Sequence, residues 1–307
     1  MGIAMADGQI TTEVGGRRLK LGNLDKILYP GTETTKGEVL HYYTQVAQPL
    51  LAVLADRPAT RIRWPHGVSD LSFFEKNLPP GAPSWLSRVA LPSSGSRGTG
   101  DEVVYPVIGE LAELMYLVNL ASLEFHVPQW RLVDDQPVAP DRLVIDLDPG
   151  APAGLTECAQ LALIVRDRLA DIGLDRCVPV TSGSKGMQVY AALDGSQSSV
   201  AVRDAARELA QQLTREHPNL VVWKMTKSKR PGKVLLDWSQ NTAAKTTIAP
   251  YSLRGKDRPT AAAPRTWNEI EDGARAPDML QQILFDDVIE RLQQHGDLFA
   301  DGLAPHD

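Results

Sequence analysis

Residues 143–150 read Leu-Val-Ile-Asp-Leu-Asp-Pro-Gly, and this stretch decides how the rest of the chain is interpreted. The aliphatic run predicts a short buried strand that stops at Pro149-Gly150. Side chains two apart on a strand point to the same face, so Asp146 and Asp148 are expected to aim both carboxylates into one space. Two like charges side by side are costly unless a cation neutralises them. Oxygen ligands suit Mg²⁺ or Mn²⁺, although an isolated Asp-x-Asp is more often an ordinary turn.

A second apolar run also ends in an aspartate, at Val234-Leu235-Leu236-Asp237-Trp238. Three carboxylates from two strands can hold two divalent ions, one that activates an attacking hydroxyl and one that carries a triphosphate. Taken alone, Asp237 would be interpreted as a capping or turn residue. Together the two runs predict a catalytic metal site at Asp146, Asp148 and Asp237.

Residues 180–187 read Val-Thr-Ser-Gly-Ser-Lys-Gly-Met, a turn of small residues between two predicted strands. Glycines let the backbone approach an anion closely, while the hydroxyls, the amides and Lys185 supply donors and charge. The spacing is not that of a P-loop, which excludes that class of ATPase. From these residues alone, a phosphate-binding turn and a plain β-hairpin turn are equally good interpretations.

The basic residues are distributed unevenly. The net charge of −6 argues against a protein that coats nucleic acid. A cleft responds to its local field, however, and basic residues cluster within positions 224–233 and again from Lys245 to Arg258. Donors of this kind are what a triphosphate needs, although a basic run by itself is usually a solvated face.

Length and composition bound the fold. The 307 residues are 43% hydrophobic and 23% charged, which allows a sizeable core and excludes a mainly disordered chain. No apolar run approaches membrane-spanning length, the N-terminus lacks a signal sequence, and the two cysteines have neither metal-ligand nor redox spacing. We therefore expect a cytoplasmic protein without a membrane partner.

The order of elements predicts an α+β chain with mixed strands and helices, and two lobes around a cleft are compatible with it. Residues 1–18 lack a sustained apolar period and are expected to form a flexible extension, followed by one domain over residues 19–307. A helix is expected from Thr34, with Thr34 or Thr35 as its cap. Further helices are expected at 110–123, 155–172, 200–215 and 286–294, strands at 57–65, 125–133, 142–147, 178–181, 187–191 and 234–238, and a flexible loop at 91–101.

Several runs, in this order, resemble the polymerase domain of bacterial ligase D, a primase-polymerase family of the archaeo-eukaryotic primase superfamily that works in non-homologous end joining. The similarity covers roughly Leu19 to Asp297. One departure is Ile62, which stands where the family often has a second basic residue. The runs are Leu24–Pro30, Arg57–Arg61, Phe73–Lys76, His126–Trp130, Asp146–Pro149, Ser182–Gly186 and Asp237–Asn241.

The resemblance implies a primase-polymerase core of mixed and antiparallel sheets with flanking helices around a cleft. It implies that Asp146, Asp148 and Asp237 hold two catalytic ions, Mn²⁺ in preference to Mg²⁺, and that His126 lies beside the nucleotide. It also implies a set of residues that bind the nucleoside triphosphate: Ser182, Gly183, Ser184 and Lys185, with Arg230, Gln240, Lys245 and Arg254 nearby.

The resemblance further implies contacts with DNA. Asn23, Lys26 and Lys36 match residues that hold the 5′-phosphate of a downstream strand, and Phe73 and Phe74 match aromatic residues that pack on bases. By composition alone the two phenylalanines fit a core equally well. Lys36 falls in the first turn of a predicted helix, where its charge is unfavourable unless an anion binds there too.

These features predict a metal-dependent, template-directed nucleotidyltransferase that fills gaps or extends DNA ends, with the family's preference for ribonucleotides, in end joining or short-gap repair. Its expected partners are DNA with gaps or ends that bear a 5′-phosphate, nucleoside triphosphates, and end-joining or ligase proteins. A protein of this kind is expected to be associated with the nucleoid. A primase that starts primers de novo is the alternative, and whether the chain stands alone or belongs to a larger protein stays open. A phosphatase of the haloacid dehalogenase type carries its Asp-x-Asp near the domain start, followed by Thr or Val, and is disfavoured. A non-catalytic DNA-end-binding module would have no reason to direct three carboxylates at DNA.

Overall fold

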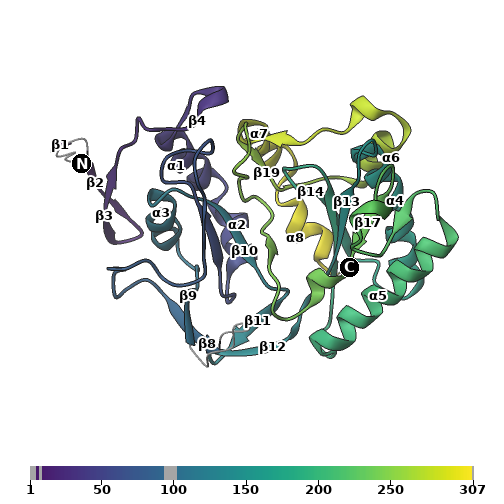
Figure 1. Cartoon of the computed structure of the whole chain (residues 1–307). Helices are drawn as coiled ribbons and strands as arrows, with labels where there is room; N and C mark the ends of the chain where they lie inside the picture. The colour runs from purple at the N-terminus through teal and green to yellow at the C-terminus, as the bar shows by residue number, and fades with distance from the viewer. Residues whose placement is uncertain (1–4, 7–8, 93–101, 306–307) are drawn as a thin grey trace.

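The computed structural model describes residues 5–6, 9–92 and 102–305, in which the chain forms two lobes, each built on its own β-sheet (Figure 1). The first half of the chain forms most of the lobe at the left of Figure 1, and the second half forms the lobe at the right. None of the helices in the described residues is both long enough and apolar enough to cross a membrane. The expected α+β class with antiparallel sheets is confirmed.

The six-stranded sheet has the strand order β16-β17-β13-β15-β14-β20. Its strands pair antiparallel except β16 with β17, which are parallel. Three helices contribute to the core on one side of this sheet: α4 (Leu155–Asp171), α5 (Ser199–Glu216) and α6 (Trp267–Arg275). In chain order the strands are β13 (Arg142–Pro149), β14 (Cys177–Thr181), β15 (Met187–Ala192), β16 (Val221–Val222), β17 (Val234–Asp237) and β20 (Ala263–Pro264).

Strand β13 separates two hydrophobic cores. Leu143, Ile145 and Leu147 pack in the core with α4 and α5, whereas Val144 belongs to the core of the other lobe. Because side chains alternate along a strand, Asp146 and Asp148 share the face of Val144, which is turned toward the other lobe. The strand also continues through Asp148 to Pro149, two residues beyond the expected end.

The four-stranded sheet of the other lobe has the order β18-β10-β6-β7, with all neighbours antiparallel. It shares a core with α1 (Lys36–Gln45), α2 (Ala47–Leu54) and α3 (Leu111–Asn119). Tyr43 of α1 packs edge-on against Phe125, with 5.5 Å between ring centroids. The strands are β6 (Thr60–Arg63), β7 (Phe73–Glu75), β10 (Ser122–Val127) and β18 (Thr247–Ile248).

Short hairpins and helices complete the fold. Strand β1 (Met5–Ala6) pairs with β2 (Gln9–Val14), which pairs with β3 (Arg17–Gly22). The other small pairs are β4 (Ile27–Tyr29) with β5 (Thr34–Thr35), β8 (Arg88–Pro92) with β9 (Glu102–Pro106), β11 (Trp130–Val133) with β12 (Gln136–Pro140), and β19 (Thr260–Ala261) with β21 (Ile283–Leu284). Helices α7 (Phe285–His295) and α8 (Leu298–Leu303) end the described chain.

Several expectations about local structure are confirmed. Thr35 caps α1, since its hydroxyl accepts from the amide of Glu38 at 3.2 Å and Glu38 Oε2 accepts from the amide of Thr35 at 2.7 Å. This reciprocal capping box fixes where the helix begins. The helices and strands expected near residues 155–172, 178–181, 187–191, 200–215 and 286–294 are all present within a residue or two.

Other expectations differ from the structure. Residues 9–18 of the expected N-terminal extension are paired in a hairpin over residues 9–22, whereas residues 1–4 and 7–8 lie outside the described residues. The strand expected at 125–133 is two strands, because Pro128 has no N–H to continue the ladder. Of the loop expected at 91–101, residues 91–92 belong to β8, and residues 93–101 lie outside the described residues.

Candidate active site

Two of the three predicted carboxylates stand opposite one another on neighbouring strands. Asp146 of β13 is the register partner of Asp237 of β17, and Asp148 lies on the same face of β13. Burial, and then the charges of Asp148 and Asp237, raise the pKa of Asp146 to about 8. Burial and the charge of Asp237 likewise raise the pKa of Asp148. The fold therefore holds mutually repelling carboxylates together.

Asp237 is held by its own neighbours. Its Oδ1 accepts from the amide of Ser239 at 3.0 Å and from the Ser239 hydroxyl at 2.5 Å, and its Oδ2 accepts from Nε2 of Gln240 at 3.0 Å. The ammonium of Lys245 lies 3.8 Å from Oδ2. Among the described residues, no three Asp, Glu, His or Cys side chains are arranged so that they could already coordinate one metal ion. The three aspartates are thus close enough to interact electrostatically, while Asp237 is engaged within its own turn.

The turn at residues 182–186 is the tip of the β14–β15 hairpin, so the hairpin interpretation of this run is confirmed. Gly183 has φ of +69°, and a Cβ there would lie 2.7 Å from the carbonyl carbon of Ala261. A Cβ on Gly186 would lie 2.0 Å from the backbone oxygen of Leu147. Both positions require glycine, and the close approach at Gly186 places the turn directly beside β13.

A cavity of about 250 Å³ joins this turn to the aspartates. It brings together residues that the sequence predicted from separate runs: His126, Asp146, Asp148, Ser182, Ser184, Lys185, Gln240 and Arg254. Gln188, Thr246, Thr247, Ile248 and Gly186 complete its lining. The turn is therefore both a hairpin tip and one wall of the carboxylate cavity.

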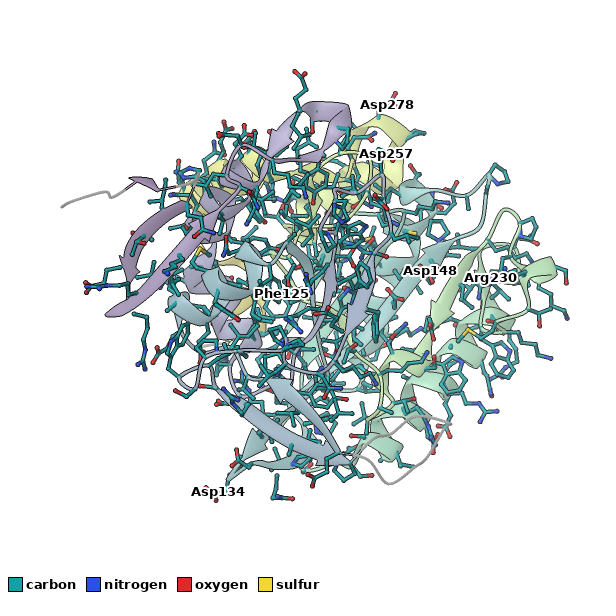
Figure 2. All side chains as sticks on the ribbon, turned by 60° about the vertical axis from the view of Figure 1, so that its left-hand side comes forward. Phe125, Asp134, Asp148, Arg230, Asp257 and Asp278 are labelled. Carbon is teal, nitrogen blue, oxygen red and sulfur yellow. The ribbon has the colours of Figure 1, made fainter. Side chains whose placement is uncertain are left out.

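Of the residues predicted to bind metal or nucleotide, four lie outside that lining, namely Asp237, Gly183, Arg230 and Lys245. Arg230 is nevertheless near enough to Asp148 to act on it electrostatically, and the two are labelled next to each other in Figure 2. The positive charge of Arg230 partly offsets the rise in the pKa of Asp148. Its Nη2 donates to the backbone oxygen of Met225 at 3.1 Å.

His126 and Arg254 are joined through Glu124. Glu124 Oε2 lies 2.8 Å from Nε2 of His126, and Oε1 accepts from Nε of Arg254 at 3.2 Å and from the amide of Gly255 at 3.0 Å. Burial alone would raise the pKa of Glu124, but the His126 hydrogen bond and the Arg254 charge lower it to about 2. Glu124 is therefore ionised and fixes two cavity residues at once.

Several polar residues of the site were not predicted from the sequence, among them Glu124, Gln188 and Gln282. Gln188 is opposite Asp146 in the β13–β15 register, and its Nε2 donates to Asp146 Oδ1 at 3.2 Å. Gln282 accepts from the amide of Gly183 at 2.7 Å and donates to the carbonyl of Gly186 at 2.9 Å. A polar residue inside an apolar strand is a usable signal for Gln188, whereas no local pattern marks Gln282.

The residues predicted to hold a 5′-phosphate also converge. The amide of Lys36 donates to the backbone oxygen of Lys26 at 2.8 Å. The amide of Lys26 in turn donates to the backbone oxygen of Asn23 at 3.1 Å. Lys36 is only 6% exposed, and its Nζ donates to the backbone oxygen of Gly22 at 2.6 Å. Burial and the charge of Lys26 lower the pKa of Lys36 to about 8.

Phe73 and Phe74 lie on β7, the edge strand of the four-stranded sheet. They are 49% and 61% exposed, so the alternative that they belong to the core is wrong. Phe74 lines a second cavity of about 630 Å³, together with Tyr105 and Trp130. This cavity shares His126, Gln240 and Thr246 with the carboxylate cavity, so the two adjoin.

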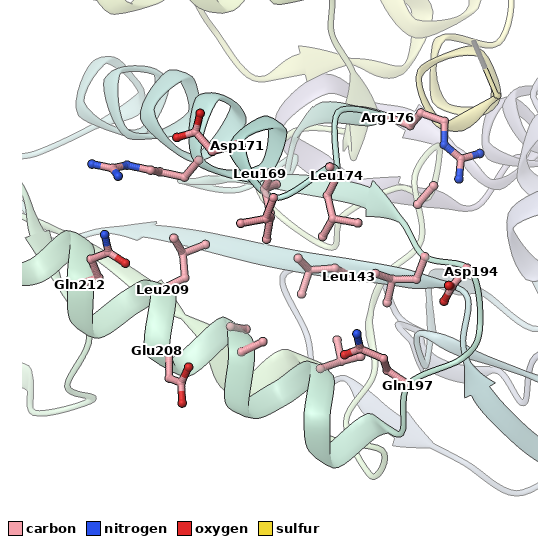
Figure 3. Close-up of a pocket in the computed structure, with 18 residues that line it drawn as sticks. Leu143, Leu169, Asp171, Leu174, Arg176, Asp194, Gln197, Glu208, Leu209 and Gln212 are labelled. Atoms are coloured by element: carbon pink, nitrogen blue, oxygen red, sulfur yellow. The ribbon is translucent and has the colours of Figure 1, made fainter. Parts of the chain in front are cut away.

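A larger cavity, of about 710 Å³, lies away from the aspartates between α4 and α5 (Figure 3). Its floor is apolar, with Leu143, Leu169 and Leu209. The charged groups around it, such as Asp171 and Glu208, belong to exposed helix surfaces. Size alone therefore does not mark the active site, whereas converging charge does.

Known proteins are similar to this chain in both sequence and fold. Residues 35–299 match the family model "LigD, primase-polymerase domain". The chain is 49% identical over 283 residues to the multifunctional non-homologous end joining protein LigD of Mycolicibacterium smegmatis, covering 92% of this chain and 36% of that protein. It is 32% identical over 287 residues to the bifunctional LigD of Bacillus subtilis, covering 92% of this chain and 44% of the relative.

The chain thus spans between a third and a half of the length of these relatives. Among solved structures, the polymerase domain of Mycobacterium tuberculosis ligase D in complex with DNA superposes with a TM-score of 0.86 at 47% identity. That match covers 92% of this chain and 97% of the other. The chain therefore belongs to the LigD primase-polymerase domain family, whose enzyme class is that of the DNA-directed nucleotidyltransferases.

Proposed function

We propose that this chain is a metal-dependent, template-directed polymerase that fills short gaps or extends DNA ends in end joining. The observation that carries the proposal is the 250 Å³ cavity, where Asp146 and Asp148 face the turn of Ser182, Ser184 and Lys185. Carboxylates opposite a cluster of anion donors are the arrangement that joining a hydroxyl to a triphosphate requires. We take residues 19–307 as one catalytic domain, to which the hairpin over residues 9–22 attaches.

The carboxylates fit a divalent metal by their chemistry. They offer only oxygen ligands, and the described residues provide no ion pair within 4.0 Å for Asp146 or Asp148. Burial, and then the charges of the neighbouring aspartates, raise the pKa values of Asp146 and Asp148, and the nearby arginines offset this rise only in part. We propose that Asp146, Asp148 and Asp237 hold two Mn²⁺ or Mg²⁺ ions. Bound metal would lower the pKa of an attacking hydroxyl and neutralise charge on the triphosphate.

The residues of this chain then have distinct roles. Ser182, Gly183, Ser184 and Lys185 bind the triphosphate through hydroxyl, amide and ammonium donors. Arg254 faces the same cavity from the opposite lobe, while Arg230, Gln240 and Lys245 flank Asp148 and Asp237. His126, held by Glu124, borders both this cavity and the adjoining apolar one and is proposed to lie beside the nucleotide.

On the DNA side, we assign Asn23, Lys26 and Lys36 to the 5′-phosphate of the downstream strand. Two ammonium groups at the start of α1, where the helix dipole favours an anion, support this assignment. Phe73 and Phe74 are proposed to pack on bases, since they are exposed aromatic side chains beside the apolar cavity. The M. tuberculosis neighbour, a structure in complex with DNA, supports DNA as the substrate.

We also propose a preference for ribonucleotides. A site that hydrogen-bonds the 2′-hydroxyl leaves polar groups unpaired when a deoxyribonucleotide binds. Competition between the two nucleotide types on one gapped template measures the preference, and equal or reversed efficiency would contradict it.

The experiment that tests the function uses gapped DNA with a downstream 5′-phosphate, a labelled nucleotide and Mn²⁺. Addition that depends on both metal and template is expected. Addition that ignores the template base, or no addition with any divalent ion, would overturn the proposal. A parallel reaction on single-stranded DNA without a primer reports primer synthesis de novo and so distinguishes a primase.

A further inference from the structure

A basic cavity lies at the other end of β13, between α2 and α8. It measures about 330 Å³, and four arginines line it, Arg57, Arg131, Arg142 and Arg176, with only two carboxylates, Asp141 and Asp297. Arg142 begins β13 and Asp148 lies six residues later, which separates the two sites by roughly 20 Å at the rise of an extended strand. None of these six residues lines the carboxylate cavity.

Both carboxylates are already engaged. Asp141 accepts from Nη2 of Arg57 at 2.6 Å and from Nε of Arg131 at 2.7 Å. Oδ1 of Asp297 accepts from the hydroxyl of Tyr251 at 2.5 Å and from the amides of Phe299 and Ala300 at 3.2 Å. The carboxylates of the cavity therefore form no ion pair with Arg142 or Arg176, and the charge of Asp141, which acts on Arg142, is shared with Arg57 and Arg131.

Arg142 is the central residue of this cavity. It is 4% exposed, and its Nε donates to Oε1 of Gln129 at 2.9 Å. Its guanidinium carbon lies 5.8 Å from the ring centroids of both Tyr190 and Phe299. No carboxylate among the described residues lies within 4.0 Å of it, although a buried charge is expensive unless it is paired.

Two other arginines of the cavity have donor groups that are unpaired or make only a long hydrogen bond. Nε of Arg57 is buried and has no hydrogen-bond partner among the described residues. Burial, and then the charge of Arg142, lower the pKa of Arg57 to about 9. At the rim, Arg176 is half-buried, and its Nη1 makes only a 3.5 Å hydrogen bond to the backbone oxygen of Leu303.

We propose that this cavity binds a small phosphate-type oxyanion, with Arg142 and Arg176 as its principal ligands. A guanidinium presents several donors in one plane and matches the oxygens of a phosphate. A volume of about 330 Å³ is large enough for a free anion such as orthophosphate or diphosphate. The proposal is independent of the polymerase assignment, since it uses none of the residues of that site.

The test is titration of the full chain with orthophosphate and, separately, with diphosphate, by calorimetry without metal and at fixed ionic strength. Arg142→Gln and Arg176→Gln are each expected to weaken binding by about tenfold or more, the loss typical of charge-assisted hydrogen bonds. Arg176 lies at the rim, so its variant keeps the test valid if Arg142→Gln fails to fold. Arg275→Gln, an exposed arginine on α6, is the matched control.

Two further variants separate this cavity from the other anion sites. Lys185→Ala and the Lys26→Ala/Lys36→Ala double variant should keep the binding that the cavity variants lose. The anion that binds more tightly identifies the ligand as orthophosphate or diphosphate. Absence of binding in the wild type, unchanged affinity in both cavity variants, or loss of binding in Lys185→Ala would overturn the proposal.

Discussion

Asp146 of β13 and Asp237 of β17 are register partners in an antiparallel strand pair, so two carboxylates from distant parts of the chain face one another. Neither is neutralised by a close arginine, and Lys245 stands 3.8 Å from Asp237. Antiparallel partners on one face bring their side chains within about 5.5 Å. Backbone pairing, rather than side-chain attraction, thus holds the repelling groups in place.

The burial of Asp146 and this repulsion together predict that Asp146→Asn stabilises the metal-free protein. The folded pKa of Asp146 is raised to about 8 from an ordinary value near 4, so the stability linked to its proton is present at low pH and is lost as the pH rises to about 8. Asn carries no charge, so the melting temperature of the variant should exceed that of the wild type increasingly from pH 5 to pH 9. About 2–4 °C is expected for each kcal/mol of repulsion removed.

Thermal unfolding in EDTA measures this effect. The control is Asp135→Asn, which changes an exposed aspartate in a turn. Adding Mn²⁺ should reverse the order, because metal stabilises the protein that binds it more tightly. A variant that melts below the wild type at pH 9 without metal would show that the Asp146 charge is not repelled.

Gln282→Ala is predicted to raise the KM for nucleoside triphosphate with little change in kcat. The Gln282 amide holds the Gly183 amide and the Gly186 carbonyl, and so positions the turn without lining the cavity. Losing two hydrogen bonds of about 1 kcal/mol each corresponds to roughly a thirtyfold rise in this KM. Steady-state kinetics measures the KM of this variant, and Gln281→Ala, a change at the exposed neighbouring residue, is the control. An equal KM in both variants would remove the positioning role.

The sequence predicted the parts of the site that depend on short-range patterns. Alternation along β13 placed Asp146 and Asp148 on one face, and small residues marked the turn that ends at Gly186. Thr35 was expected at the start of α1 as one of two capping residues. Each of these features is decided by residues within a few positions of one another, which is why one sequence suffices.

What depends on long-range packing could not be predicted. Gln282 acts on residues 96 and 99 positions away, and Glu124 binds Arg254 across 130 positions. The hairpin over residues 9–22 has weak apolar alternation and is held partly by Leu19, whose contacts come from later in the chain. The exposure of Phe73 and Phe74 follows from the edge position of β7, which composition does not reveal.

Lys26 and Lys36 are predicted to make the protein prefer gapped DNA with a downstream 5′-phosphate over the same DNA with a 5′-hydroxyl. A charge-assisted contact set corresponds to roughly a tenfold to hundredfold difference in Kd at fixed salt. The pKa of Lys36 is lowered to about 8, so its ammonium loses its proton above that pH, and the preference should shrink between pH 7 and pH 9.

Binding of both DNAs by fluorescence anisotropy measures this preference. Lys26→Ala/Lys36→Ala should erase the difference yet leave extension of a simple primer–template intact, while Lys20→Ala on β3 serves as the exposed control. Equal binding of the two DNAs by the wild type would show that Lys26 and Lys36 do not bind the 5′-phosphate.

The rate of Mn²⁺-dependent nucleotide addition to gapped DNA by Asp148→Asn and Asp237→Asn tests the central claim most directly. Both substitutions keep the side-chain shape and remove a carboxylate that we assign to metal, whose transition-state stabilisation is worth several kcal/mol. The account predicts a fall of at least about a hundredfold in each variant, with DNA binding close to that of the wild type and of Asp194→Asn and a melting temperature no lower than theirs. Turnover near the wild-type rate in either folded variant would contradict it.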